Sequence, residues 1–122
     1  MRHLRSLAAA LLLAALSPMA AAPATAHAVI MSAVPTADQQ VAPGHVAIRL
    51  EFNARIDKAR SRLQLTAPDG ARSDVAIDPG GQPNIITATT ADLTTGPYVL
   101  RWQVLAIDGH ITRGDIPFRV AD

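Results

Sequence analysis

The chain has no cysteine among its 122 residues. A domain without thiols cannot form disulfides, so packing alone must hold its fold together. Zinc fingers, iron–sulfur clusters and the blue-copper site all need cysteine thiolates, and the absence of cysteine excludes each of them.

The start of the chain also lacks an apolar run long enough to cross a bilayer. Residues 7–16 are uncharged and apolar, but they fall far below the roughly 20 residues that a membrane-spanning helix needs. Arg2 and Arg5 precede this run, and the small residues 24–26 (ATA) follow it. This order is typical of a Sec-type signal peptide, which we predict over residues 1–26.

Cleavage after Ala26 would make His27 the first residue of the mature protein, with a free α-amine next to its imidazole. Residues 27–122 would then form one exported domain, large enough for a single core. Two other interpretations remain open at this point, an uncleaved anchor and a cut after Ala22. Either one would remove the amine from His27.

A strong excess of one charge is missing as well. The full chain has 11 Lys and Arg against 10 Asp and Glu, and the signal peptide takes away two arginines and no acid. The mature chain is therefore close to neutral and slightly acidic. This balance gives no indication of a nucleic acid or an anionic membrane as a partner.

Alternating apolar residues, which are typical of half-buried strands, run through the mature chain. We expect short strands near residues 28–31, 45–52, 61–67, 75–77, 85–89, 98–107 and 116–120. Turn residues separate them, such as Pro68-Asp69-Gly70, in which proline presets φ and glycine accepts a positive φ.

No segment sustains the apolar period of a helix, and we expect residues 54–62 to form a loop or a single turn. Seven short strands with regular turns predict an all-β, seven-stranded Greek-key β-barrel or sandwich.

One acid and one histidine lie next to each other at the end of the longest expected strand. Gly109 can bend the chain so that Asp108 and His110 project to one side. Together with the amine and Nδ1 of His27, they would supply a mainly nitrogen donor set with one oxygen, which suits Cu(II). The alternative is an ordinary Asp-Gly turn followed by a histidine that faces solvent.

The mature chain resembles the CopC/PcoC family of periplasmic copper-binding proteins along nearly its whole length. Residues 27–35 (HAVIMSAVP) resemble the family's opening, and residues 42–52 (APGHVAIRLEF) resemble its proline turn and following strand. The most specific stretch is residues 96–110 (GPYVLRWQVLAIDGH), followed by Gly114 and Phe118.

The resemblance implies a cupredoxin-like (Ig-like) topology and a copper-resistance, homeostasis or import function. It also implies one Cu(II) ion bound by the amine and Nδ1 of His27, an imidazole nitrogen of His110 and a weaker oxygen of Asp108. An inner-membrane copper transporter of the CopD type is the partner that the family suggests.

Methionines are nearly absent from the mature chain, which keeps only Met31. Cu(I) prefers several soft thioether ligands, so we expect a single Cu(II) site and no separate Cu(I) site. We expect Met31, Tyr98 and Trp102 to lie in the core and His45 to be a surface histidine.

We therefore predict a monomeric copper carrier or buffer that is not an enzyme and is not inserted in the membrane after cleavage. Two alternatives remain. One is a copper redox enzyme of the histidine-brace, monooxygenase-like type, for which the aromatic content of 3% offers little substrate-binding surface. The other is a metal-free β-sandwich module for interaction.

Overall fold

The computed structural model describes residues 28–122, which form eight strands and no helix. The predicted signal peptide and His27 lie outside the described residues. The strands are β1 (Ile30–Val34), β2 (Gln40–Val41), β3 (Gly44–Phe52), β4 (Ile56–Thr66), β5 (Arg72–Val75), β6 (Ile85–Leu93), β7 (Gly96–Ala106) and β8 (Ile111–Val120). Within this part of the chain, no helix is long and apolar enough to span a membrane.

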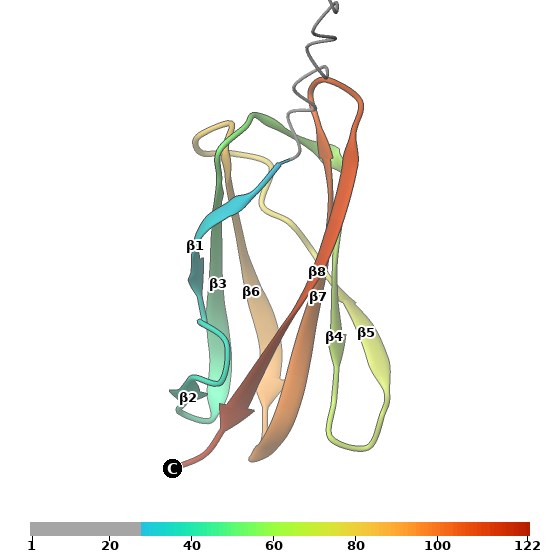
Figure 1. Cartoon of the computed structure of the whole chain (residues 1–122). Coiled ribbons are helices and arrows are strands. Elements are labelled where there is room, and N and C mark those ends of the chain that lie inside the picture. The colour runs from blue at the N-terminus through green and yellow to red at the C-terminus, as the bar shows by residue number, and fades with distance from the viewer. Residues whose placement is uncertain (1–27) are drawn as a thin grey trace, which may run out of the picture.

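The strands form two facing sheets (Figure 1). One sheet has three strands in the order β1-β3-β6, and the other has five in the order β2-β8-β7-β4-β5. The chain crosses between the sheets several times, including from β3 to β4 and from β6 to β7, as in a Greek key. The predicted all-β sandwich of cupredoxin-like type is confirmed.

The core lies between the sheets and is filled by alternate residues of each long strand. In β7, Tyr98, Leu100, Trp102 and Val104 are all buried, as their spacing predicts. Strand β3 contributes a second row in the same way. Its buried residues are Val46, Ile48, Leu50 and Phe52.

Trp102 is held by two close neighbours. Its ring meets Phe52 edge to face, with centroids 5.4 Å apart and planes at 70°. It also lies against Gly114, its cross-strand partner in β8, where an added Cβ would come within 2.4 Å of the indole. A side chain at position 114 would collide with the indole, so this close approach requires glycine.

Residues 54–62 are not the loop that we expected. Strand β4 begins at Ile56 and pairs with β7, but its register shifts between Asp57 and Arg62. Such an irregularity breaks the two-residue alternation on which the sequence argument depends. The two-residue β2, which pairs in parallel with β8, was not foreseen either, so eight strands replace the predicted seven.

The prediction that Met31 is a core residue is wrong. Its side chain is 65% exposed. The register of β1 against β3 shifts between Ile30 and Ser32, so Met31 lies in a bulge that turns its side chain outward.

Candidate metal centre

The turn between β7 and β8 carries Asp108, Gly109 and His110. Two backbone hydrogen bonds close it, from the Gly109 N–H to the Ala106 carbonyl and from the Ala106 N–H to the His110 carbonyl, both 2.9 Å long. Gly109 has a φ of 92°, which an L-residue with a side chain rarely adopts. The glycine therefore permits the bend that places the acid and the histidine side by side.

The carboxylate of Asp108 faces His110 with both of its oxygens. Oδ1 accepts the backbone N–H of His110 at 3.1 Å, and Oδ2 lies 3.1 Å from Nδ1 of the ring. The backbone hydrogen bond, followed by that from the ring, lowers the pKa of Asp108 below its usual value. The carboxylate thus stays ionised at neutral pH.

This pair fits a transition-metal ion. Two neighbouring ligands around one ion with bonds of about 2 Å lie roughly 3 Å apart, so the pair has a suitable spacing once the Nδ1–H that bonds to Oδ2 gives up its proton. Both side chains are accessible, at 46% for His110 and 36% for Asp108. Residues 28–122 contain no group of three His, Cys, Asp or Glu side chains that could hold a metal, so the turn needs donors from elsewhere.

The start of the described chain is fixed near the end of β3. Ala28 is buried at 1% exposure. Asn53 forms two hydrogen bonds with Val29, the residue after Ala28. Its Oδ1 accepts the Val29 N–H at 2.7 Å, and its backbone N–H donates to the Val29 carbonyl at 3.0 Å. His27, the predicted ligand, lies outside the described residues but is bonded directly to Ala28.

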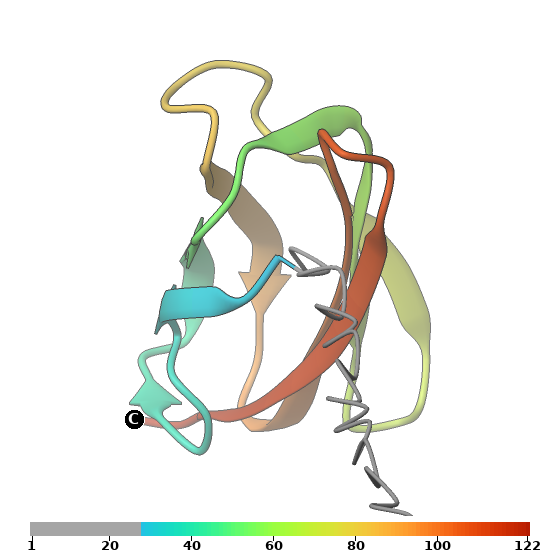
Figure 2. The same cartoon turned by 45° about the horizontal axis from the view of Figure 1, so that its top comes forward.

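The β3–β4 connection also contacts the chain next to the β7–β8 turn. The Arg55 carbonyl accepts the N–H of Ile107 at 3.0 Å, one residue before Asp108. The beginning of β1, the β3–β4 connection and the β7–β8 turn lie toward the same end of the sandwich (Figure 1, Figure 2). Sequence reasoning missed Asn53, because a single asparagine after a strand carries no local signal of a contact 24 residues away.

His45 does not join this group. It lies near the start of β3, at the opposite end of the sandwich (Figure 1), and is exposed as predicted. Its Nδ1 lies 2.9 Å from the Thr90 carbonyl.

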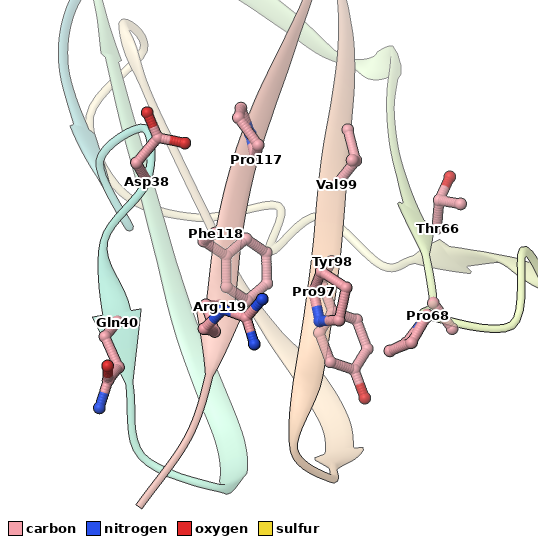
Figure 3. Close-up of a pocket in the computed structure, with 11 residues that line it drawn as sticks. Asp38, Gln40, Thr66, Pro68, Pro97, Tyr98, Val99, Pro117, Phe118 and Arg119 are labelled. Carbon is pink, nitrogen blue, oxygen red and sulfur yellow. The ribbon is translucent and has the colours of Figure 1, made fainter.

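A broad hollow of about 490 Å³ lies beside β2, at the end of the sandwich where β3 and β7 begin (Figure 1, Figure 3). Tyr98 and Phe118 stack beneath it with ring centroids 5.7 Å apart, and the Tyr98 hydroxyl donates to the Thr94 carbonyl. Prolines 68, 97 and 117 form much of its wall. Asp38 is the only carboxylate among the described residues that line it, so it offers no metal site.

Comparison with known proteins gives one family. The family model of the CopC domain matches residues 30–121. A protein named Copper resistance protein C from Pseudomonas syringae pv. tomato is 27% identical over 104 residues, which cover 80% of this chain and 82% of that protein. Protein YobA of Escherichia coli K12 is 29% identical over 100 residues, covering 78% and 79% of the two chains.

Solved structures of CopC and PcoC have a similar fold. CopC from Methylosinus trichosporium OB3b superposes with a TM-score of 0.70 at 28% identity, covering 77% of this chain and 93% of that one. PcoC from Escherichia coli, described as a methionine-rich copper resistance protein, has a TM-score of 0.62 at 28% identity, covering 79% of this chain and 100% of that one.

Proposed function

The chain belongs to the CopC family, and on this basis we propose that it is a periplasmic copper carrier or buffer that holds a single Cu(II) ion. The ligands in this proposal are the α-amine and Nδ1 of His27, an imidazole nitrogen of His110 and an oxygen of Asp108. Copper is the cargo of the protein, and no chemical step is assigned to it.

The observation that carries the proposal is the spacing of Asp108 and His110. Their side-chain donors are 3.1 Å apart on an accessible turn, and a buried Ala28 anchors the chain directly after His27. Consecutive Cα atoms are about 3.8 Å apart, so the anchor lies one residue from the proposed chelating amine. Three nitrogens and one oxygen make the tetragonal donor set that Cu(II) prefers.

Cleavage of the signal peptide after Ala26 is part of the proposal, because an uncut chain has no amine at His27. The mature protein would then be residues 27–122 in the periplasm. The amine and the imidazole must lose their protons to bind a metal, so copper uptake releases protons and weakens in acid.

The surface supports a carrier and not a polysaccharide oxidase. All four aromatic side chains of the chain are buried, namely Phe52, Tyr98, Trp102 and Phe118. No aromatic face is therefore available within the described residues to bind a sugar chain beside the turn. Met31 is the one thioether of the mature chain, which supports one Cu(II) site without a Cu(I) site.

A soluble monomer would pass its copper to another protein. The receiver in this proposal is an inner-membrane copper transporter of the CopD type, which the family suggests. The accessible position of His110 and Asp108 at the tip of the sandwich suits such a transfer.

The test is a calorimetric titration of the mature protein, produced with His27 as its verified first residue. We expect saturation at one equivalent of Cu(II) and an electron paramagnetic resonance spectrum of a tetragonal, nitrogen-rich site. No saturable binding would favour a metal-free interaction module. Reductant-dependent oxidation of a polysaccharide by the copper-loaded protein would instead make it an enzyme.

A further inference from the structure

We propose that Asn53 is a positioning residue that holds the first residues of the mature chain against the Asp108–His110 turn. This inference rests on the proposed function, since it concerns how the amine of His27 reaches the copper site. Asn53 is not itself a ligand in this account.

Asn53 fixes the backbone of Val29 through two hydrogen bonds. Both the side-chain Oδ1 and the backbone N–H of Asn53 bond to the backbone of Val29, at 2.7 and 3.0 Å. Val29 precedes β1, and Asn53 follows β3, so these bonds continue the β1–β3 pairing beyond the two strands. The ladder between β1 and β3 is itself irregular there, because its register shifts between Ile30 and Ser32.

The residue that Asn53 fixes is close along the chain to the proposed ligand. Val29 is two residues after His27, and the residue between them, Ala28, is buried. Ala28 and Val29 are therefore fixed directly after the proposed ligand. A chelating residue that is already in place loses less conformational freedom when the metal binds.

The β3–β4 connection, which carries Asn53, also contacts the residues that precede Asp108. Two residues after Asn53, the carbonyl of Arg55 accepts the N–H of Ile107, and Ile56 then pairs with Ala106. The β3–β4 connection therefore bonds to the chain start on one side and to the residue before Asp108 on the other. In this proposal it positions Val29 relative to the β7–β8 turn.

The chemistry of the amide suits this task. An amide oxygen accepts the Val29 N–H without adding a charge beside the metal. Aspartate would keep the acceptor, whereas leucine has a similar size and none. The two substitutions therefore separate the hydrogen bond from the volume of the side chain.

The experiment compares Asn53→Leu, Asn53→Ala and Asn53→Asp in mature protein that begins at His27. We expect Asn53→Leu and Asn53→Ala to bind Cu(II) about tenfold more weakly, as for other residues that orient metal ligands. Their spectra should broaden because the amine is held less well, and the Val29 amide should exchange faster in metal-free protein. Asn53→Asp should restore both the spectrum and the slow exchange.

Asn84→Leu is the matched control. Asn84 comes directly before β6 and its Nδ2 donates to the carbonyl of Phe52, the last residue of β3, at 3.2 Å. Among the described residues it has no hydrogen bond to Val29. We expect this variant to keep the copper affinity and the spectrum of the unaltered protein.

The outcomes separate the two proposals. If the unaltered mature protein does not bind Cu(II), the proposed function fails. If it binds and Asn53→Leu shows the same affinity, spectrum and amide exchange, only the role of Asn53 is wrong. Equal losses in Asn53→Leu and Asn84→Leu would mean general loosening of this end and would also overturn it.

Discussion

The two ends of the sandwich are built from different kinds of residue. At the end with the β7–β8 turn, Asp108 and His110 are accessible and are held by backbone hydrogen bonds. At the other end, Tyr98 and Phe118 stack in the core, and Gly96 lies so close to Pro68 that an added Cβ would come within 2.5 Å of it. One end presents two side-chain donors on an accessible turn, and the other has stacked rings and prolines beneath a broad hollow.

The size of a hollow does not distinguish the two ends, because a second hollow of about 480 Å³, lined in part by Asn53, Arg55 and Asn84, lies at the end of the proposed copper site. The hollow of about 490 Å³ lies at the packed end, where rings and prolines form its wall (Figure 3). The proposed copper site is an exposed turn with two donors at a ligand-like spacing. A small ion needs a few correctly spaced atoms more than it needs an enclosed volume.

The largest expected effect separates stability from copper binding at the packed end. Phe118 is 2% exposed and stacks on Tyr98, so Phe118→Ala should lower the free energy of unfolding by about 3–5 kcal/mol. Urea denaturation measures this loss, and Phe118→Leu should show a smaller one. Copper affinity measured at a temperature where the variant is folded should be unchanged. A tenfold weaker affinity would mean that the two ends are not independent.

The reverse result is expected at the turn. His110→Ala should weaken Cu(II) binding at least about 100-fold, or roughly 2.7 kcal/mol, in a competition titration against a chelator of known affinity. Because the side chain is 46% exposed, its urea midpoint should change little. His45→Ala is the matched control and should keep the affinity. Loss of affinity in that control would place copper at the opposite end.

Much of the fold could be predicted because alternation survives where strands pair regularly. The buried residues of β3 and β7 follow a strict two-residue period, and both strands lie where we expected them. The errors fall where the register shifts. The irregularity in β4 interrupts the apolar alternation, so residues 54–62 were predicted as a loop. The bulge in β1 turns Met31 outward. Such irregularities depend on partner strands that are distant in the sequence.

In the candidate site as well, local contacts could be predicted and contacts between distant residues could not. Asp108 and His110 are two residues apart, so a local glycine turn was enough to predict that they meet. The role of His27 stays a prediction, since it depends on where the signal peptide is cut. Asn53 could not be foreseen, because its contact with Val29 exists only once β1 has paired with β3.

A smaller change at the turn tests the part played by charge. Asp108→Asn keeps an oxygen that can accept the His110 N–H but removes the negative charge. Since Asp108 is the weaker ligand in the proposal, we expect affinity to fall about tenfold, which is less than for His110→Ala. Calorimetry on both variants gives the order directly. A larger loss for Asp108→Asn would make the carboxylate the principal ligand.

The smallest effect concerns the ion pair of Arg101 and Asp115 on the outer face of the five-stranded sheet. Arg101 donates to both oxygens of Asp115, at 2.9 and 3.1 Å, and thereby lowers the pKa of that carboxyl. The pair therefore stabilises the fold above the unfolded pKa of about 3.9, and this contribution is lost as pH falls through the lower folded value. Because both side chains are about half exposed, Asp115→Asn should lower the melting temperature at pH 7 by about 2 °C or less.

Melting curves at pH 7 and below pH 3 check this expectation. The difference between Asp115→Asn and the unaltered protein should disappear at the lower pH. Asp74→Asn is the control, since Asp74 forms no ion pair within the described residues. A difference that grows in acid would mean that the ion pair is not its source.

The most direct test of the account is the effect of one added residue at the start of the mature chain. Protein beginning at His27 and protein beginning at Ala26 differ by a single peptide bond, which removes the α-amine from the histidine. Competition titration with Cu(II) should show at least about 100-fold weaker binding for the longer protein, because a bidentate chelate is lost. Equal affinity of the two proteins would contradict a copper site that depends on the amine of His27.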